Sequence, residues 1–324
     1  MNGGRNTFRI LFGFALLILL AGIFGYLTLF SGTVGLSWSD AFLFDDSVAS
    51  RVFWDIRVPR LVAAVLSGIS LSIAGLSLQT LFRNPLAGPF VLGISSGASL
   101  GVALSLLAGF SFGRLGVLSA AAIGALVVTA LVMSVASHFR NSTVLLIVGL
   151  LIGYFIDALV SLLIVQGDAE SLKVYVSWGM GSFGRLTFDG IWLFVVTVAV
   201  GVALIAVSMR YLNAVRMGED FAAGLGVNVR LDRKLVLLGA SLLAASSTAF
   251  CGPVAFVGIA VPHLAFMLFK TGNHRVLLPG SALCGVVLCL LAGFFSSVPL
   301  NAVLSLVGVP VVLSVIVRGR GVRE

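Results

Sequence analysis

The side chains that could do chemistry in this sequence are few and far apart. No cysteine or histidine stands in a C-x-x-C, C-x-x-C-H or H-E-x-x-H arrangement. The cysteines lie in or beside apolar runs, which favours small core residues, and the histidines lie near the ends of such runs, which favours capping and loop positioning. We therefore expect no catalytic residue and no metal or haem ligand. These residues are Cys251, Cys284, Cys289, His138, His263 and His274.

One acidic residue, Asp157, lies inside an apolar run, LLIGYFIDALVSLLI. An ionisable group within a membrane span is costly and marks a functional site by default. Asp157 could serve an ion-coupled secondary carrier of a small solute. Alternatively, its carboxylate could line a wet cavity or bond to neighbouring helices. A relay usually needs several such groups, so ion coupling is the secondary hypothesis.

The sequence contains no G-x-x-x-x-G-K-[ST] loop, because none of its lysines stands in the required glycine frame. The chain therefore does not bind ATP through a P-loop. If it transports a solute at the expense of ATP, another chain must supply the ATPase.

The composition excludes a cytosolic enzyme. The 324 residues are 59% hydrophobic and 10% charged, whereas a soluble domain is about 45–50% apolar and about 25% charged. The net charge of +8 does not indicate a nucleic-acid partner, because the arginines lie in short loops between apolar runs, where they orient a membrane protein.

The elements that must position these residues are membrane-spanning helices. Such a helix needs roughly 20 apolar residues, and about ten runs of this kind follow one another. With a cytoplasmic N-terminus, 14 of the 20 lysines and arginines fall in inner loops, as the positive-inside rule requires. We predict an all-α membrane protein with one transmembrane domain over 1–324, about ten transmembrane helices and both termini in the cytoplasm. The predicted spans are 10–30, 61–81, 89–109, 115–137, 143–165, 190–209, 234–250, 254–269, 276–296 and 299–317.

An inner loop at about 210–234 is long enough to hold structure of its own. It has helix-forming and capping residues around Gly218, Glu219 and Asp220, followed by glycines at Gly224 and Gly226. This pattern predicts a short helix and turn that docks a partner. Two outer loops, at about 31–58 and 166–189, are also long.

Glycines spaced four residues apart predict close helix packing. Gly93, Gly97 and Gly101 form one such row, and Gly149 and Gly153 form another. In lipid, where the hydrophobic effect does not drive helices together, such rows let helix backbones approach closely.

The segment 57–101 strongly resembles the permease family of the vitamin B12, haem and iron-siderophore ABC importers. It carries the R-x-P-R of that family and then the pattern G-x-x-Q-x-x-x-R-N-P-L-A-x-P-x-x-L-G-x-x-x-G-A, with the first glycine one residue from its usual spacing. A string of this length is far more specific than a short motif. The matching residues are Arg57, Pro59, Arg60, Gly75, Gln79, Arg83, Asn84, Pro85, Leu86, Ala87, Pro89, Gly93, Gly97 and Ala98.

Four further stretches extend the resemblance over nearly the whole chain. They are Trp178, Gly181 and Ser182; Gly218, Ala222, Leu225, Gly226 and Val227; Phe256, Gly258, Pro262, His263, His274, Leu277, Leu278, Pro279 and Ser281; and Pro299, Gly308 and Pro310. The sequence departs from the family where an arginine is replaced by Phe266, two acids by Gly293 and Ser297, and a glycine by Asn301.

The resemblance implies a type II ABC importer permease fold. It also implies a transmembrane subunit that moves a metal chelate into the cytoplasm by alternating access, with an iron-siderophore as the default cargo and haem or cobalamin as alternatives. The implied partners are a second copy of the chain, two ABC ATPases that bind ATP and Mg²⁺, and a periplasmic or lipid-anchored binding protein. The chain would then be a multi-pass protein of the bacterial cytoplasmic (inner) membrane, without a cofactor of its own.

The resemblance also assigns roles to residues. The loop that couples to the ATPase would use Gly218, Glu219, Asp220, Ala222, Leu225 and Gly226. The binding protein would dock on Arg57 and Arg60, the cytoplasmic gate would contain Asn141, Ser142 and Thr143, and Asp157 would face the pathway. The family signature would rest on Gln79, Arg83, Asn84, Pro85, Gly93, Gly97, Pro262 and His263.

Alternatives to these roles stay open at the level of sequence. Glu219 and Asp220 could be solvated caps only, and Arg57 and Arg60 could contact lipid headgroups. A membrane receptor or scaffold that transports nothing is a further possibility.

Overall fold

The structure is a computed structural model that describes residues 2–31, 47–110, 116–138, 142–295 and 298–320. The described residues form helices joined by turns, and no strand occurs among them, which confirms the all-α class. The elements are α1 (Asn2–Phe30), α3 (Val48–Arg51), the π-helical η1 (Val52–Arg57), α4 (Val58–Phe82), η2 (Pro89–Leu92), α5 (Ile94–Leu106), α6 (Val117–His138), α7 (Ser142–Gln166), α8 (Ala169–Gly179), η3 (Phe183–Arg185), α9 (Phe188–Val207), α10 (Met209–Val215), α11 (Glu219–Gly224), α12 (Val229–Cys251), α13 (Val257–Phe269), α14 (His274–Phe294) and α15 (Leu300–Arg320).

Every predicted span coincides with an apolar helix. In the described part of the chain, 7 helices are long and apolar enough to cross a membrane. Three shorter apolar helices, Ile94–Leu106, Val257–Phe269 and Leu300–Ser314, account for the other predicted spans. The chain is therefore a multi-pass helical protein, and the exact count of ten crossings stays a prediction.

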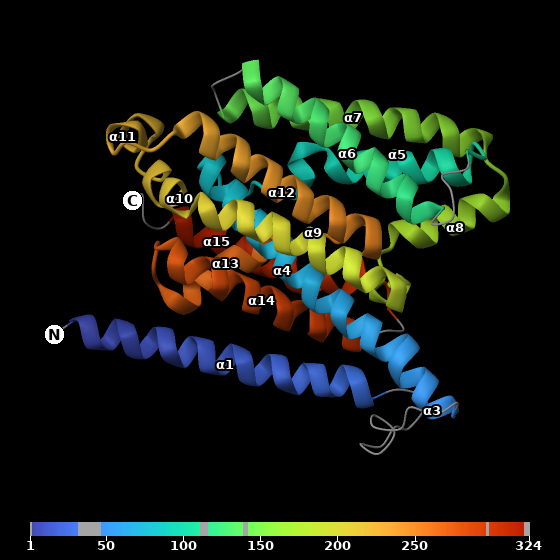
Figure 1. The fold of residues 1–324 in the computed structure, drawn as a ribbon, viewed down its shortest axis with the longest axis horizontal. Coiled ribbons are helices and arrows are strands. Elements are labelled where there is room, and N and C mark those ends of the chain that lie inside the picture. Colours follow the sequence, from blue (N-terminus) through green and yellow to red (C-terminus); the bar gives the residue numbers. More distant parts are fainter. Residues whose placement is uncertain (1, 32–46, 111–115, 139–141, 296–297, 321–324) are drawn as a thin grey trace.

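The helices run roughly parallel or antiparallel in one elongated bundle (Figure 1). The start of α1, the last turns of α15 and the short helices α10 and α11 lie together at one end, called here the α11 end. The short helices α3 and α8 lie at the opposite end, called here the α8 end. The start of the first described helix and the end of the last one thus lie on the same side of the bundle. That this side is cytoplasmic stays a prediction.

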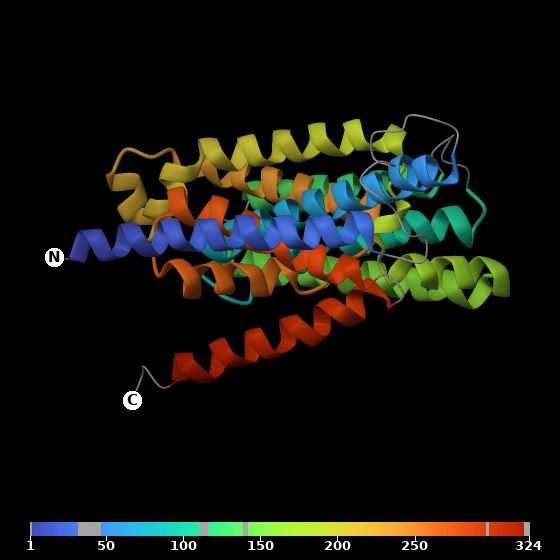
Figure 2. The same ribbon diagram turned by 90° about the horizontal axis from the view of Figure 1, so that it is seen from below.

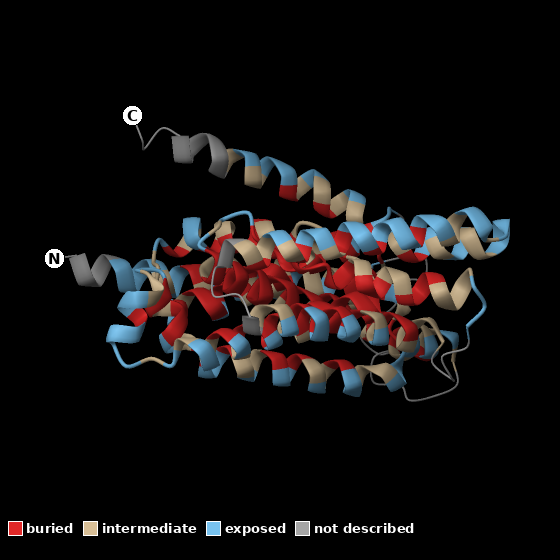
Figure 3. Cartoon of the chain, turned by 90° about the horizontal axis from the view of Figure 1, so that it is seen from above, coloured by how far each residue is buried: buried red, intermediate tan, exposed pale blue. Residues whose placement is uncertain are grey.

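Helix α4 is the centre of the packing. It contacts α12, α13 and α14, and most of its residues are buried, including serines on several of its faces. Buried residues accordingly concentrate along the middle of the bundle (Figure 3). Helix α15 diverges from the bundle towards its C-terminal end (Figure 2), and its buried residues lie near its start.

The predicted glycine contacts are confirmed. A Cβ on Gly101 of α5 would lie 2.0 Å from the carbonyl oxygen of Ala120 in α6. A Cβ on Gly93 would lie 3.1 Å from the carbonyl oxygen of Gly149 and 3.2 Å from the nitrogen of Gly153. Both rows therefore hold backbones at distances that larger side chains would not allow.

Glycines of α4 also lie close to the backbones of neighbouring helices. A Cβ on Gly75 would lie 1.8 Å from the carbonyl oxygen of Gly258, at the start of α13. A Cβ on Gly68 would lie 2.6 Å from the backbone of Gly285 in α14. Two glycine pairs therefore bring α13 and α14 against the same central helix.

We expect Gly75→Ala to lower the thermal unfolding midpoint of the purified chain in detergent, because overpacking of this kind costs about 1–3 kcal/mol. Gly22→Ala in α1 is the matched control, since its Cβ would meet no atom within 4 Å. Equal midpoints for the two variants would contradict the close approach of α4 and α13.

Candidate functional site

The family-signature residues from two distant stretches meet at the α11 end. They line a hollow of about 330 Å³ between the end of α4, the turn that follows it and α13. The signature residues around it are Gln79, Arg83, Asn84, Pro85, Pro262 and His263, and the departing residue Phe266 lines the same hollow.

Hydrogen bonds hold this turn against α13. The Gln79 side-chain amide donates to the carbonyl oxygen of Ile259 at 3.0 Å. The Nε2 atom of His263 lies 2.9 Å from the carbonyl oxygen of Pro85. Gln79 and His263 therefore hold backbone segments in place. These hydrogen bonds account for a glutamine and a histidine at the two positions without a bound ligand.

A second set of bonds ties α10 to the core of the bundle. The Asn213 Oδ1 atom of α10 accepts from the backbone N–H of His274 at 2.9 Å and lies 2.9 Å from Nδ1 of the same ring. The other ring nitrogen, Nε2, lies 2.9 Å from the Thr80 hydroxyl of α4. Nearby, the Arg216 guanidinium donates to the carbonyl oxygen of Gly272. Helix α10 is thus linked directly to α14 and, through one ring, to α4.

Helix α11 follows α10 and is the short helix that the sequence predicts. Gly218 has φ +123° and Gly226 has φ +76°, so the chain turns sharply on both sides of it in conformations that favour glycine. Three apolar side chains stand exposed around the helix, Met217 at 71%, Phe221 at 47% and Leu225 at 61%. Apolar groups gathered on an exposed loop indicate a docking surface for another protein.

The two acids of α11 differ in their surroundings. Asp220 is exposed, whereas Glu219 is half-buried. Burial raises the pKa of the Tyr211 phenol in α10, and the charge of Glu219 raises this pKa further while Arg233 lowers it. The Glu219 carboxylate is therefore close enough to Tyr211 of α10 to influence its pKa, in the region where α10, α11 and α12 meet.

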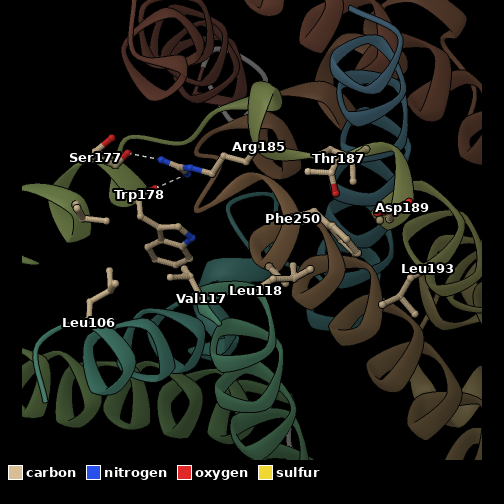
Figure 4. Close-up of a pocket in the computed structure, with 14 residues that line it drawn as sticks. Leu106, Val117, Leu118, Ser177, Trp178, Arg185, Thr187, Asp189, Leu193 and Phe250 are labelled. Carbon is tan, nitrogen blue, oxygen red and sulfur yellow. Dashed lines mark hydrogen bonds between the residues drawn. The ribbon is translucent and has the colours of Figure 1, made fainter. Parts of the chain in front are cut away.

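The α8 end contains a hollow of about 500 Å³ between α5, α6, α8, α9 and the end of α12 (Figure 4). Arg185 lies along its wall and donates to the carbonyl oxygens of Ser177 at 2.5 Å and Trp178 at 3.0 Å. Burial lowers the pKa of this guanidinium. Arg185 therefore fastens the end of α8 to the turn before α9.

Asn301, where the family usually has glycine, also joins segments at the α8 end. Its amide nitrogen donates to the carbonyl oxygens of Pro253 at 2.9 Å and Gly179 at 3.2 Å. Its amide oxygen accepts from the backbone N–H of Ala255 at 2.9 Å. This departure thus connects α15, the end of α8 and the chain between α12 and α13.

The two arginines expected to meet a binding protein have different environments. Arg57 is only 7% exposed, and its guanidinium donates to the carbonyl oxygen of Leu29 at 2.7 Å. Arg60 is half-buried, and a Cβ on Gly184 would lie 3.3 Å from its guanidinium. In the single chain, Arg60 is the more accessible of the pair.

The predicted gate and pathway residues lie on or before α7. Asn141 lies outside the described residues, and Ser142 and Thr143 form the first turn of α7. Asp157 is exposed on the same helix. Burial raises the pKa of Tyr175 in α8, and the Asp157 charge adds to this rise, so the carboxylate lies within electrostatic reach of α8. Among the described residues, no group of three or more His, Cys, Asp or Glu side chains is placed to hold a metal ion.

The sequence profile of the FecCD transport family matches residues 16–318. The chain belongs to the FecCD transport family. The resemblance inferred from the signature string is thereby confirmed.

Relatives and solved structures agree with this assignment. The FecCD chain is 36% identical over 287 residues to an uncharacterised ABC transporter permease protein, YvrB, of Bacillus subtilis, covering 85% of this chain and 81% of YvrB. It is 31% identical over 324 residues to the vitamin B12 import system permease protein BtuC of Salmonella typhi, covering 97% and 96% of the two chains. It matches, with a TM-score of 0.82 and 30% identity over 93% of this chain and 97% of the other, an inward-facing structure assigned to the metal-chelate type of ABC transporter.

Sequence reasoning about this FecCD protein missed the residues that connect its elements. Asn213, Thr80 and Arg185 stand in no motif, and their partners lie on other helices. Asn301 was visible as a departure from the family pattern, but its bonding was not. No local signal could have found these contacts.

We expect Asn213→Ala to increase backbone hydrogen exchange in α10 and α11, because a buried donor left without its acceptor costs about 1–3 kcal/mol. The measurement is hydrogen–deuterium exchange on the full chain in detergent. Asn228→Ala is the matched control, because the Asn228 Oδ1 atom accepts from the Leu231 N–H at 3.1 Å and caps α12 only. Unchanged exchange in α10 of the Asn213→Ala chain would show that the link to His274 does not hold this element.

Proposed function

We propose that this chain is the transmembrane subunit of an ATP-driven ABC importer for metal chelates. Two copies would pair around one pathway, two ABC ATPases would bind ATP and Mg²⁺ at the α11 end, and a binding protein would deliver cargo at the α8 end. The membership in the FecCD family supports this proposal, together with the names of its relatives, which include a vitamin B12 permease and a metal-chelate type transporter.

The observation that carries the proposal is the construction of α11. Phe221 on this short helix and Met217 and Leu225 on either side of it are exposed apolar side chains. The preceding helix is bonded to His274 and, through that ring, to Thr80. A partner that pushes on α11 would therefore push on α14 and α4 as well. This is the mechanical requirement for converting the closure of an ATPase pair into the tilting of transmembrane helices.

The pathway of the importer is proposed to run along α7. Tyr154, Asp157 and Ser161 are exposed and recur at three- and four-residue intervals, so they form one polar stripe on the helix. Leu151 and Phe155 are exposed beside it. A second copy could cover the apolar side chains while the polar stripe faces a water-filled path.

The cargo is proposed to be a metal chelate, with an iron-siderophore as the default and haem or cobalamin as alternatives. A pathway for a bulky chelate must pass it without binding it tightly, because tight binding would prevent release. Small polar side chains such as Ser142, Thr143 and Ser161 suit that requirement.

The first test is to purify the tagged chain from its own membranes in mild detergent and to identify the proteins that accompany it. Co-purification of a P-loop ATPase at about one copy per chain, with uptake that stops when ATP is depleted, is the expected result. A homomer whose uptake continues after ATP depletion but stops when the proton gradient is dissipated would contradict the proposal. That result would favour an ion-coupled carrier that uses Asp157.

We expect the double variant Glu219→Ala/Asp220→Ala to insert normally and to lose uptake by about tenfold or more, the scale of a typical coupling energy between sites. Loss of the negative first turn weakens the contact of α11 with its partner. Glu170→Ala/Asp189→Ala removes the same charge at the α8 end and is the matched control. Normal uptake by the α11 variant would show that these acids are solvated caps.

A further inference from the structure

A hollow of about 800 Å³ opens at the α11 end between the last turn of α9, α10 and the turn before α14. Three arginines line it: Arg210 from α10, Arg216 from the position directly after α10, and Arg275 from the first turn of α14. The hollow is separate from the exposed apolar side chains of α11, none of which lines it.

Among the residues that the structure describes, no acidic side chain neutralises the arginines of this hollow. No acidic residue lines it, and within the described part of the chain no hydrogen bond or ion pair engages the side chains of Arg210 or Arg275. Arg216 donates to the carbonyl oxygen of Gly272, which holds its guanidinium against the wall. Three like charges around one cavity repel each other, so an anion in the cavity would stabilise the arrangement. The planar guanidinium fork matches phosphate oxygens particularly well.

The position of the hollow identifies the source of the phosphate. Helix α9 runs along the outside of the bundle (Figure 2), and only 22% of its apolar span is buried. Its exposed apolar face ends at Val207, which is 75% exposed and lines the hollow together with Ala206. The cavity therefore lies where the lipid-facing surface of a span meets the arginines of the next helix. Basic pockets at such helix ends are suited to anionic lipid headgroups.

We propose that this hollow binds the phosphate headgroup of an anionic phospholipid, with the acyl chains lying along the exposed face of α9. Phosphatidylglycerol has the required chemistry: one phosphate charge, no compensating amine and two acyl chains. The bound phosphate would bridge Arg210 of α10 and the adjoining Arg216 to Arg275 of α14. It would thereby reinforce the link that Asn213 and His274 already make between the same two helices. A lipid would then help to hold the element that carries α11.

The test is native mass spectrometry of the full chain in detergent, titrated separately with phosphatidylglycerol and phosphatidylcholine. The wild-type chain is expected to retain phosphatidylglycerol in preference to phosphatidylcholine, and Arg210→Gln/Arg275→Gln is expected to reduce this retention by about tenfold, since each arginine near the surface contributes measurably. Arg230→Gln/Lys234→Gln is the matched control, because both residues are exposed in the first turns of α12 at the same end and do not line the hollow. The control is expected to retain the lipid within about twofold of wild type.

Three results would overturn the proposal. Equal loss of lipid in both double variants would show a diffuse effect of charge. Displacement of phosphatidylglycerol by millimolar inorganic phosphate would show a site for soluble anions. Unchanged lipid retention combined with loss of a co-purifying ATPase would assign the arginines to a protein partner.

A charge-preserving variant separates folding from binding. Arg210→Lys/Arg275→Lys keeps the two positive charges but loses the guanidinium forks, so it is expected to retain more lipid than the glutamine variant and less than wild type. A glutamine variant that elutes with wild type on size exclusion is folded well enough for the comparison. Because lipid retention is measured without transport, failure of this proposal leaves the importer proposal untouched, and the reverse also holds.

Discussion

The contact on which the rest of the structure depends is the close approach of α4 to α13 and α14. Gly75 meets Gly258, and Gly68 meets Gly285, at distances where a single methyl group would collide with backbone. Lipid tails are as apolar as leucine, so burial of apolar surface does little to hold helices together in a membrane. Attraction between closely packed backbones must supply that role, and it falls steeply when a gap opens. The two glycine pairs therefore set where α13 and α14 lie, and α14 in turn sets where His274 lies.

The position of the exposed helix α11 depends in turn on His274. Helix α11 has 6 residues, too few to be stable alone in water. Its position depends on α10, which is hydrogen-bonded through Asn213 to His274 and, through that ring, to the central helix α4. A short helix held in this way moves with the helices behind it and does not bend independently. The signature residues Gln79 and His263 serve the neighbouring turn in the same manner, since each bonds to a backbone carbonyl.

Features with a local signal could be predicted from the sequence. Hydropathy predicted the apolar helices, and glycine spacing predicted that the segments at 93–101 and 149–153 pack closely, because both signals lie within one segment. Which helix each row meets was not predicted. The predicted span began near residue 234, whereas α12 begins at Val229. The charged residues Arg230 and Asp232 lower the hydropathy of the first helical turn, so hydropathy did not include it. The bond between Asn213 and His274 joins residues 61 apart, and no local pattern encodes it. The burial of Arg57 likewise depends on where the end of α1 lies, which the sequence near the arginine does not show.

Asp157 sets a constraint on any assembly of this chain. Its side chain is exposed in the single chain, on a helix of which only 22% of the apolar span is buried. An ionised carboxylate near the centre of a bilayer costs about 2.5–3.5 kcal/mol by insertion measurements and more by simulation. The face of α7 that carries Asp157 is therefore poorly suited to lipid, whereas the face of α9 that ends at Val207 is well suited to it. This difference between two outward-facing helices predicts that α7 faces protein or water in the working assembly and that α9 faces the bilayer. It also explains how one chain could form a polar pathway on one helix and a lipid site beside another without conflict between the two.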